Sequence, residues 1–382
     1  MVYLDYAATT PYNKDVLKTY TQLLEKYFYN ADSIYSQGIE VNRLLEKSRG
    51  LLAKMLDVDE EEMIFTSCGS EANNMAIKGI AFQYQNRGKH IITTSIEHSS
   101  VYEACKELEE VFGFDVTYLP VDHSGHISID DLKKSIREDT ILVSVMHINN
   151  EVGAIQPLKE IAAVLEDFPK IHFHVDAVQG VGKGIQELLE QDRVDFLTFS
   201  GHKFHAPRGI GFMYKKRGRM IAPLMSGGGQ EKALRSGTEN LPAIASMAKA
   251  LRLTLENEEK KVAQQKAIKE KIYNHISKRS KVTVFSKLND EFAPHILCFA
   301  ISGVRGETIV HAFENYDIYI STTSACSSKK GITSGTLTAM KIPDNIATSA
   351  VRVSLDEKNT LAEADKFIEI FLKIKTSLPK NQ

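Results

Sequence analysis

The sequence of 382 residues lacks several signals that would place it in a special class of protein. Its four cysteines are scattered without metal-ligand spacing, so we expect free thiols in a reducing compartment and no metal site. No apolar run is long enough to span a bilayer. The first residues carry neither the basic region nor the apolar core of a signal peptide. We therefore expect a cytoplasmic protein with no membrane partner.

The sequence also lacks an imbalance of charge. The formal net charge is −2, so nothing in the bulk charge favours a nucleic-acid or membrane surface, and we expect no direct contact with nucleic acid. A hydrophobic content of 43% and a charged content of 25% are typical of an ordinary globular protein. The length allows two or three domain-sized units.

Short apolar, β-prone runs alternate with helical patterns from residue 63 to residue 214, which predicts an α/β fold with a mainly parallel sheet. A long charged helix over 242–277 would lead into a smaller α+β domain. We expect a large domain over 12–258 and a small domain made of 1–11 and 259–382. The strands of the large domain are predicted at 63–67, 90–94, 115–119, 140–147, 171–175, 195–199 and 209–214.

Two of these strands end in residues that suit a pyridoxal phosphate (PLP) site. Lys203 follows the strand 195–199, and Asp176 follows the strand 171–175. Ligands of open α/β sheets bind beyond the carboxyl ends of the strands, where a sheltered lysine can form a Schiff base with the PLP aldehyde. A carboxylate can keep the pyridine nitrogen protonated. The alternatives are a solvated strand end for Lys203 and a helix cap for Asp176.

Other polar residues follow neighbouring strands. The small-residue turn at Gly69 and Ser70 precedes a helix and could cradle a phosphate, although Ser70 could equally be a simple N-cap with Asn73 at N3. His98 and the pair Asn149–Asn150 fall past strand ends on the same sheet edge. Polar side chains from several strands gathered at one sheet edge favour a binding site there.

One cysteine stands apart from the others. Cys326 lies in a polar, glycine-ended stretch with two lysines nearby, so we expect it to be accessible and its thiolate to be favoured. Cys298, inside an apolar run, is predicted to be core, and Cys105, on an amphipathic helix, is predicted to be packing. Cys68, beside the glycine turn, has no predicted role.

Taken together, these segments resemble the cysteine desulfurases of the NifS/IscS type, which belong to the class V aminotransferase family of PLP fold type I. The resemblance runs from Tyr3 to about Ser354. Its motifs are Phe65-Thr66-Ser67 followed by Ser70-Glu71, Glu97-His98, Asn149-Asn150-Glu151-Val152-Gly153, His174-Val175-Asp176-Ala177-Val178-Gln179, Ser200-Gly201-His202-Lys203, Arg235-Ser236-Gly237-Thr238 and Ser324-Ala325-Cys326-Ser327-Ser328.

The resemblance implies a role for each matching residue. Lys203 would be the Schiff-base lysine, Asp176 the partner of the pyridine nitrogen, and Cys326 the catalytic cysteine. His98 would stack on the ring and belong to the catalytic set, and Arg352 would bind the substrate carboxylate. The remaining cofactor contacts would come from Gly69, Ser70, Asn150, Gln179, Ser200, His202 and, from the neighbouring subunit of a homodimer, Thr238, with Asn150 also close to the substrate.

The implied activity is conversion of L-cysteine to L-alanine, with the sulfur held on Cys326 as a persulfide and passed to an acceptor. The acceptor could be an iron-sulfur scaffold or a protein of the 4-thiouridine synthase type. Two alternatives stay open: a selenocysteine lyase or other class V PLP enzyme, and a weakly active sulfur-relay partner protein.

The sequence departs from the family pattern in several places. The usual Asn-Pro-Ser-Ser and its following histidine are absent at 30–35, and the stretch 329–334 after Cys326 does not match the usual loop. Ser-Leu-Gly near the C-terminus becomes Ser354-Leu355-Asp356. None of these changes removes a group that the reaction needs, but they leave the sulfur acceptor undetermined.

Overall fold

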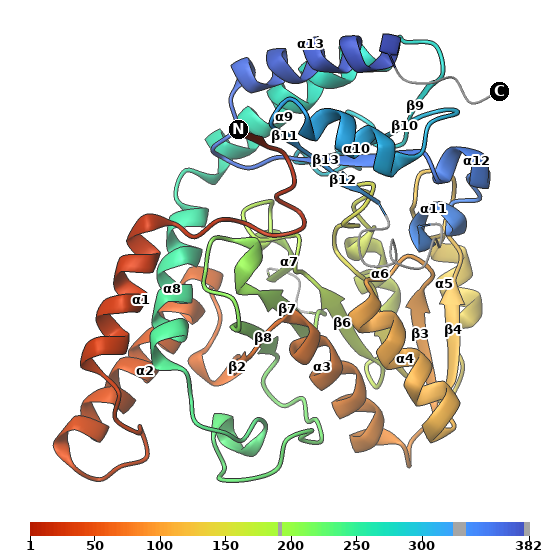
Figure 1. Cartoon of the computed structure of the whole chain (residues 1–382). Coiled ribbons are helices and arrows are strands. Elements are labelled where there is room, and N and C mark those ends of the chain that lie inside the picture. The colour runs from red at the N-terminus through yellow and green to blue at the C-terminus, as the bar shows by residue number, and fades with distance from the viewer. Residues whose placement is uncertain (190–192, 324–333, 378–382) are drawn as a thin grey trace.

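A computed structural model describes residues 1–189, 193–323 and 334–377 (Figure 1). Two sheets dominate the described chain, and each lies against its own set of helices. This architecture confirms the predicted α/β class. No helix in the described ranges is both long and apolar enough to cross a membrane.

The larger sheet has seven strands. β8 runs antiparallel to both of its neighbours, and the pairs from β7 to β4 are all parallel. Helices cover both faces, so the central strands are buried along their whole length and appear in the sequence as continuous apolar runs. In spatial order the strands are β2 (Met63–Thr66), β8 (Gly211–Lys215), β7 (Phe196–Ser200), β6 (His172–Asp176), β5 (Thr140–Ser144), β3 (His90–Thr94) and β4 (Asp115–Leu119).

The helices of this part bury apolar faces in two clusters, one on each side of the sheet. One cluster joins α3 (Gly69–Tyr84) and α4 (Ser99–Phe112) to the sheet. The other lies under α2 (Ser36–Leu56), α6 (Leu158–Glu166) and α8 (Leu241–Leu255). The remaining helical elements are α1 (Lys14–Lys26), η1 (Glu60–Glu62), α5 (Ile129–Ser135), α7 (Gln186–Leu189), η2 (Gly201–Lys203) and η3 (Glu231–Ala233).

The smaller sheet is antiparallel and lies at the top of Figure 1. Its core is rich in phenylalanine, with Phe313 stacked on Phe367 at a centroid distance of 4.7 Å. A short parallel pair, β1 (Val2–Tyr3) with β11 (Ile318–Tyr319), brings the N-terminus to this part. The other elements are β12 (Ser321–Thr322), β13 (Ala350–Ser354), β10 (Ile296–Ile301), β9 (Val282–Val284), α9 (Glu258–Ile276), α10 (Gly306–Glu314), α11 (Gly335–Ala339), α12 (Asp344–Ala347) and α13 (Leu361–Ser377).

The prediction of one long helix was wrong. The single helix expected over 242–277 is two helices, because α8 ends at Leu255 and α9 begins at Glu258. Asn257 between them has a φ of 57°, in the left-handed region, which a continuous right-handed helix excludes. The break lets α8 pack with α1 and α2 while α9 packs against α13 and the smaller sheet. The proposed division into domains at residues 258 and 259 stays a prediction.

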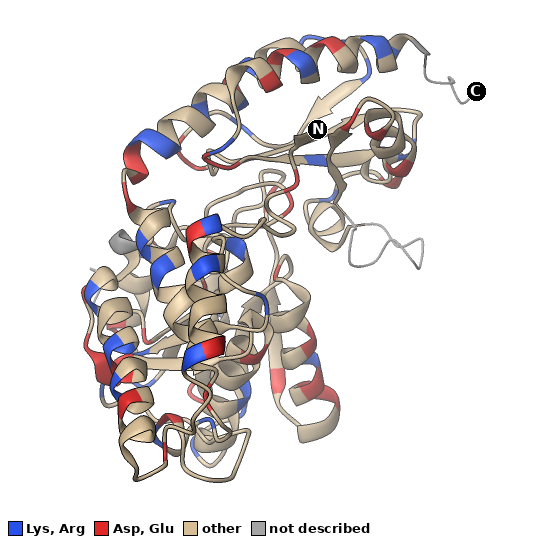
Figure 2. Ribbon diagram, turned by 60° about the vertical axis from the view of Figure 1, so that its left-hand side comes forward, with Lys and Arg blue, Asp and Glu red and all other residues tan. Residues whose placement is uncertain are grey.

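Charged residues of both signs are intermixed over the helices of the described chain, as Figure 2 shows. This distribution accords with the small net charge of −2. Of the cysteines in the described ranges, Cys105 and Cys298 are fully buried in apolar clusters, which confirms both core predictions. Cys68 is half-buried at the start of α3.

Candidate active site

The residues predicted for the site gather at one edge of the seven-stranded sheet. This is the edge where β2, β3, β5, β6 and β7 end. Parallel strands bring their carboxyl ends together, so segments far apart in the sequence become neighbours. The residues supplied there are Gly69 and Ser70 after β2, His98 after β3, Asn150 after β5, Asp176 and Gln179 from β6, and Ser200, His202 and Lys203 from β7.

Lys203 ends the short helix η2 directly after β7. Its Nζ donates hydrogen bonds to the carbonyl oxygens of Ala7, at 2.6 Å, and Ala8, at 2.9 Å. Gln179 Nε2 donates to the same Ala7 oxygen at 3.1 Å. The N-terminal segment therefore borders the lysine, which is half-buried rather than a solvated strand end. Sequence reasoning missed this contact.

Asp176 is buried at the end of β6. Its two oxygens accept hydrogen bonds from Asn73 Nδ2 at 2.8 Å and from the Val178 backbone N–H at 3.0 Å. No helix in the described chain begins at Asp176, so the helix-cap alternative was wrong. Asn73 also donates to Ser100 Oγ at 2.8 Å and accepts from Thr198 Oγ1. Asn73 thus positions the carboxylate, a role that sequence reasoning did not assign.

His98 begins α4 and shares this network. Its Nδ1 lies 2.8 Å from Ser100 Oγ and accepts from the Ser100 backbone N–H at 3.2 Å. Because Nδ1 accepts from an N–H, the neutral ring carries its hydrogen on Nε2. Burial lowers the pKa of His98; the charge of Asp176 opposes this shift, and the charge of Lys203 adds to it. The charges of Asp176 and Lys203 therefore act on the His98 ring with opposite signs.

The glycine turn meets the end of β7. A Cβ on Gly69 would lie 3.0 Å from Ser200 Cβ, so a larger residue would require the end of β7 to shift by a few tenths of an ångström. Helix α3 begins at Gly69 with Cys68 as its N-cap, and Ser70 is exposed in its first turn. The alternative of Ser70 as the N-cap was therefore wrong. The arrangement presents backbone N–H groups and the positive helix end that suit a phosphate.

His202 lies in the short helix η2, two residues after Ser200. Its Nδ1 is 3.1 Å from Thr9 Oγ1. Burial, then the charges of Lys203 and Arg208, lower the pKa of His202 to about 4. The ring is therefore neutral at pH 7. Thr238 is exposed in the loop before α8, and Arg235 in this loop forms an ion pair with Glu71 of α3 at 2.7 Å.

Arg352 comes from β13 of the smaller sheet. It is buried, and its Nη1 donates to the Asn150 carbonyl while its Nη2 donates to Asp5 Oδ1, both at 2.7 Å. Burial raises the pKa of Asp5, and Arg352 opposes that shift. The structure thus brings together the two residues predicted for the substrate, Arg352 and Asn150. It adds Asp5, which the sequence did not single out.

Cys326 lies outside the described residues. The strand that precedes it, β12, pairs with β13 so that Ser321 stands opposite Arg352.

These residues fit PLP. A buried carboxylate, a lysine amine, an imidazole and a glycine turn at a helix start are the groups that a pyridine ring, an aldehyde and a phosphate require. The hydrogen bonds from Asn73 and Val178 hold this carboxylate in place at the end of β6.

The chain belongs to the class V aminotransferase family, whose pattern matches residues 2–367. PLP is the cofactor of this family. Within it, the chain is 56% identical over 371 residues to a NifS/IcsS protein homolog from Lactobacillus delbrueckii subsp. bulgaricus, covering 97% of this chain and 96% of the relative. It is 39% identical over 388 residues to cysteine desulfurase IscS from Dictyoglomus turgidum, covering 100% and 97%.

Solved structures agree. A protein described as NifS-like superposes with a TM-score of 0.92 at 36% identity, covering 99% of this chain and 100% of the other. A second structure, described as SspA in complex with cysteine, superposes with a TM-score of 0.80 at 32% identity, covering 94% of this chain and 99% of the other. The resemblance to the NifS/IscS type and the PLP fold type I architecture are thereby confirmed.

Proposed function

We propose that this protein is a PLP-dependent cysteine desulfurase, which converts L-cysteine to L-alanine and takes the sulfur onto Cys326 as a persulfide. One observation carries the proposal: Asp176, His98 and Lys203 come from β6, the start of α4 and the end of β7 to one sheet edge, and Arg352 of the second sheet donates to Asn150 at that edge. Curated relatives named cysteine desulfurase, similar over nearly the whole chain, support the choice of substrate.

Different residues would hold the different parts of the cofactor. Lys203 would hold the aldehyde, Asp176 the pyridine nitrogen and His98 one face of the ring. Bound PLP would withdraw electrons from the substrate's α-carbon. The phosphate would be held by Gly69, Ser70, Ser200 and His202, with Asn150 and Gln179 near the ring.

The protein's own groups would do the remaining work. The Lys203 amine, once released, would take the α-proton, and the carbonyls of Ala7 and Ala8 would orient it by the contacts that they make now. Arg352 would bind the substrate carboxylate through two parallel hydrogen bonds. The Cys326 thiolate would attack the substrate sulfur, so that an S–S bond forms as the C–S bond breaks and its electron pair stays with the carbon.

We propose that the active form is a homodimer, with Thr238 reaching the phosphate of the partner's site. Gln230, in the loop that leads to Thr238, donates to Asp32 in the α1–α2 turn at 2.8 Å. That turn exposes large apolar side chains, including Phe28 and Ile34, the latter 94% exposed. Exposed apolar groups next to a binding loop support a subunit interface. Light scattering should give a dimer, and Ile34→Asp should weaken it.

The acceptor of the sulfur is proposed to be a protein, either an iron-sulfur scaffold or a 4-thiouridine synthase type. A cytoplasmic location stays a prediction.

The test uses the purified full chain with PLP, L-cysteine and a thiol reductant, following alanine and sulfide together. Equal amounts over many turnovers would support the desulfurase. Bound cofactor without turnover, restored by an added acceptor, would favour the sulfur-relay alternative. Alanine release from selenocysteine but not from cysteine would favour the lyase.

A further inference from the structure

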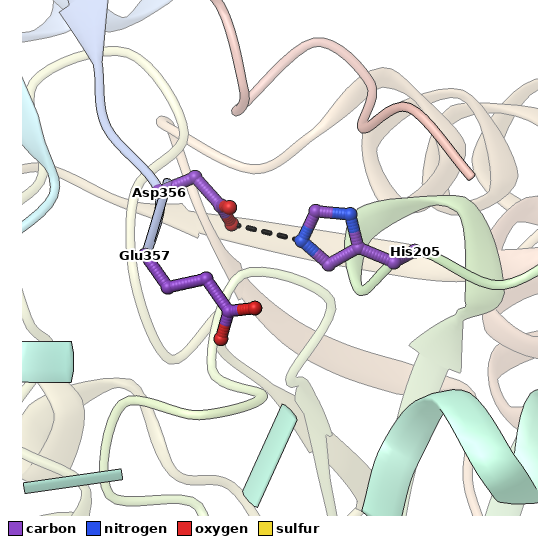
Figure 3. A group of neighbouring side chains, drawn as sticks. All are labelled: His205, Asp356 and Glu357. Carbon is purple, nitrogen blue, oxygen red and sulfur yellow. Dashed lines mark hydrogen bonds and ion pairs between the residues drawn. The ribbon is translucent and has the colours of Figure 1, made fainter. Parts of the chain in front are cut away.

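A buried hydrogen bond between a histidine and an aspartate joins the loop that carries Lys203 to the chain just after β13. His205 lies two residues beyond Lys203, and its Nε2 is 3.0 Å from Asp356 Oδ2. The side chains are only 6% and 10% exposed. Figure 3 shows the two facing each other.

The hydrogen bonds hold both partners of this pair in place. His205 Nδ1 lies 2.8 Å from the Pro11 carbonyl oxygen, which can only accept, so Nδ1 carries a hydrogen. On the other side of the ring, Nε2 lies 3.0 Å from a carboxylate oxygen of Asp356. Burial raises the pKa of Asp356, but the hydrogen bond and charge of His205, with Lys183, bring it below its ordinary value. The His205 ring is therefore held between the Pro11 carbonyl and the Asp356 carboxylate.

The backbone of His205 is fixed as well. Its φ is 66°, in the left-handed region that residues other than glycine seldom adopt. Its N–H donates to Thr10 Oγ1 at 2.8 Å, and Thr10 Oγ1 donates to the His202 carbonyl at 2.9 Å. The N-terminal segment thus holds this loop from one side, and Asp356 holds it from the other.

A cation site is the competing interpretation of the same residues. Ligand atoms of His205, Asp356 and Glu357 lie within 4.8 Å of one another (Figure 3). However, His205 Nε2 is already bonded to Asp356, and Glu357 forms an ion pair with Lys261 at 2.5 Å. A cation would have to break both of these contacts, so the structure favours the direct contact between His205 and Asp356 over a cation site.

We propose that His205 and Asp356 are positioning residues that hold the Lys203 loop against the end of β13, and so fix Lys203 relative to Arg352. This inference rests on the proposed roles of Lys203 and Arg352. Lys203 and Arg352 would act on one substrate but come from different sheets. The contact between His205 and Asp356 joins those sheets, two residues after Lys203 and four residues after Arg352. The charged groups around the pair are Lys183, Lys203, Glu357, Lys261, Glu258 and Lys358, with the phenol of Tyr6 beside the His205 ring.

The test is a double-mutant cycle on the full chain with H205N, D356N and both together. Asparagine tolerates the positive φ of His205, and D356N keeps the shape of the carboxylate. E357Q is the matched control, because it removes a neighbouring charge without touching His205. The first readout, made without PLP, is amide hydrogen exchange of peptides covering 5–11 and 200–208. The second is the dissociation constant of PLP from its visible absorbance.

Each single variant should speed exchange in both peptides and weaken PLP by about tenfold, and the double variant should add little more. E357Q should match wild type. Additive effects, or exchange unchanged in D356N, would overturn the proposal, and an E357Q effect as large as that of D356N would assign the cluster to a cation. The exchange readout needs no catalysis. Failure to form alanine would therefore count against the proposed function alone.

Discussion

Replacing Arg352 by lysine tests whether this side chain binds the substrate carboxylate. In the resting protein Arg352 makes two charge-assisted hydrogen bonds of 2.7 Å, one to Asp5 and one to the Asn150 carbonyl. A substrate carboxylate would take the same planar fork. Lysine keeps the charge but cannot make the parallel pair, so one such bond is lost, worth about 1.5–3 kcal/mol. The expected loss in kcat/KM for L-cysteine is roughly 10- to 150-fold.

The assay is alanine formation, with the visible absorbance of bound PLP as the check that the site is intact. Dissociation constants of L-cysteine and of cysteamine, which lacks the carboxylate, separate the proposed role from a structural one. R352K should weaken cysteine and leave cysteamine unchanged. The matched variant D5N removes the negative charge that Arg352 now pairs with and should not weaken cysteine. A kcat/KM within about twofold of wild type, or equal losses for both ligands, would refute the reasoning.

Three further outcomes are expected. Lys203→Ala should abolish the visible absorbance of covalently held PLP, and an unchanged spectrum would contradict the lysine assignment. Cys326→Ala should keep the cofactor and lose sulfur transfer almost entirely, whereas an aminotransferase would be indifferent in the same alanine and sulfide assay. Burial raises the pKa of Glu97 to about 8, so the folded protein binds one proton more than the unfolded chain between about pH 4.5 and 8. The free energy of unfolding of wild type should therefore fall as pH rises through that window, and that of E97Q should fall less. Denaturant titrations at several pH values measure both, and parallel pH curves for the two proteins would contradict the raised pKa of Glu97.

The part of the site that the sequence predicted has a local signature. Lys203, Asp176 and His98 each follow a short apolar run, and parallel strands carry their ends to one edge whatever the loops do. Asn73 has no such signature, because its role depends on partners from three other segments, and Ser70 three residues earlier drew attention to a helix cap instead. The backbone carbonyls of Ala7 and Ala8 leave no mark in a sequence at all, since every residue has one.

The fold was predictable for the same reason. The prediction failed where the conformation of a single residue decided the outcome. The apolar spacing of 242–277 is helical throughout, and only the left-handed φ of Asn257 separates α8 from α9. Asparagine tolerates that region but does not require it, so the residue type alone could not place the break. The break matters for function, because α9 packs against the smaller sheet, which supplies Arg352.

Burial, more than pairing, sets the charge of the site. His202 is neutral at pH 7 because its burial lowers the pKa to about 4, and the pKa of His98 falls for the same first reason. The positive charge of Lys203 lowers each pKa further. With both imidazoles neutral, a ring placed there would meet the Asp176 side chain at one end without competing histidine cations. The same neutral state lets His98 offer its Nε2 hydrogen while its Nδ1 stays bound to Ser100, which fixes the ring plane that the proposed stacking requires.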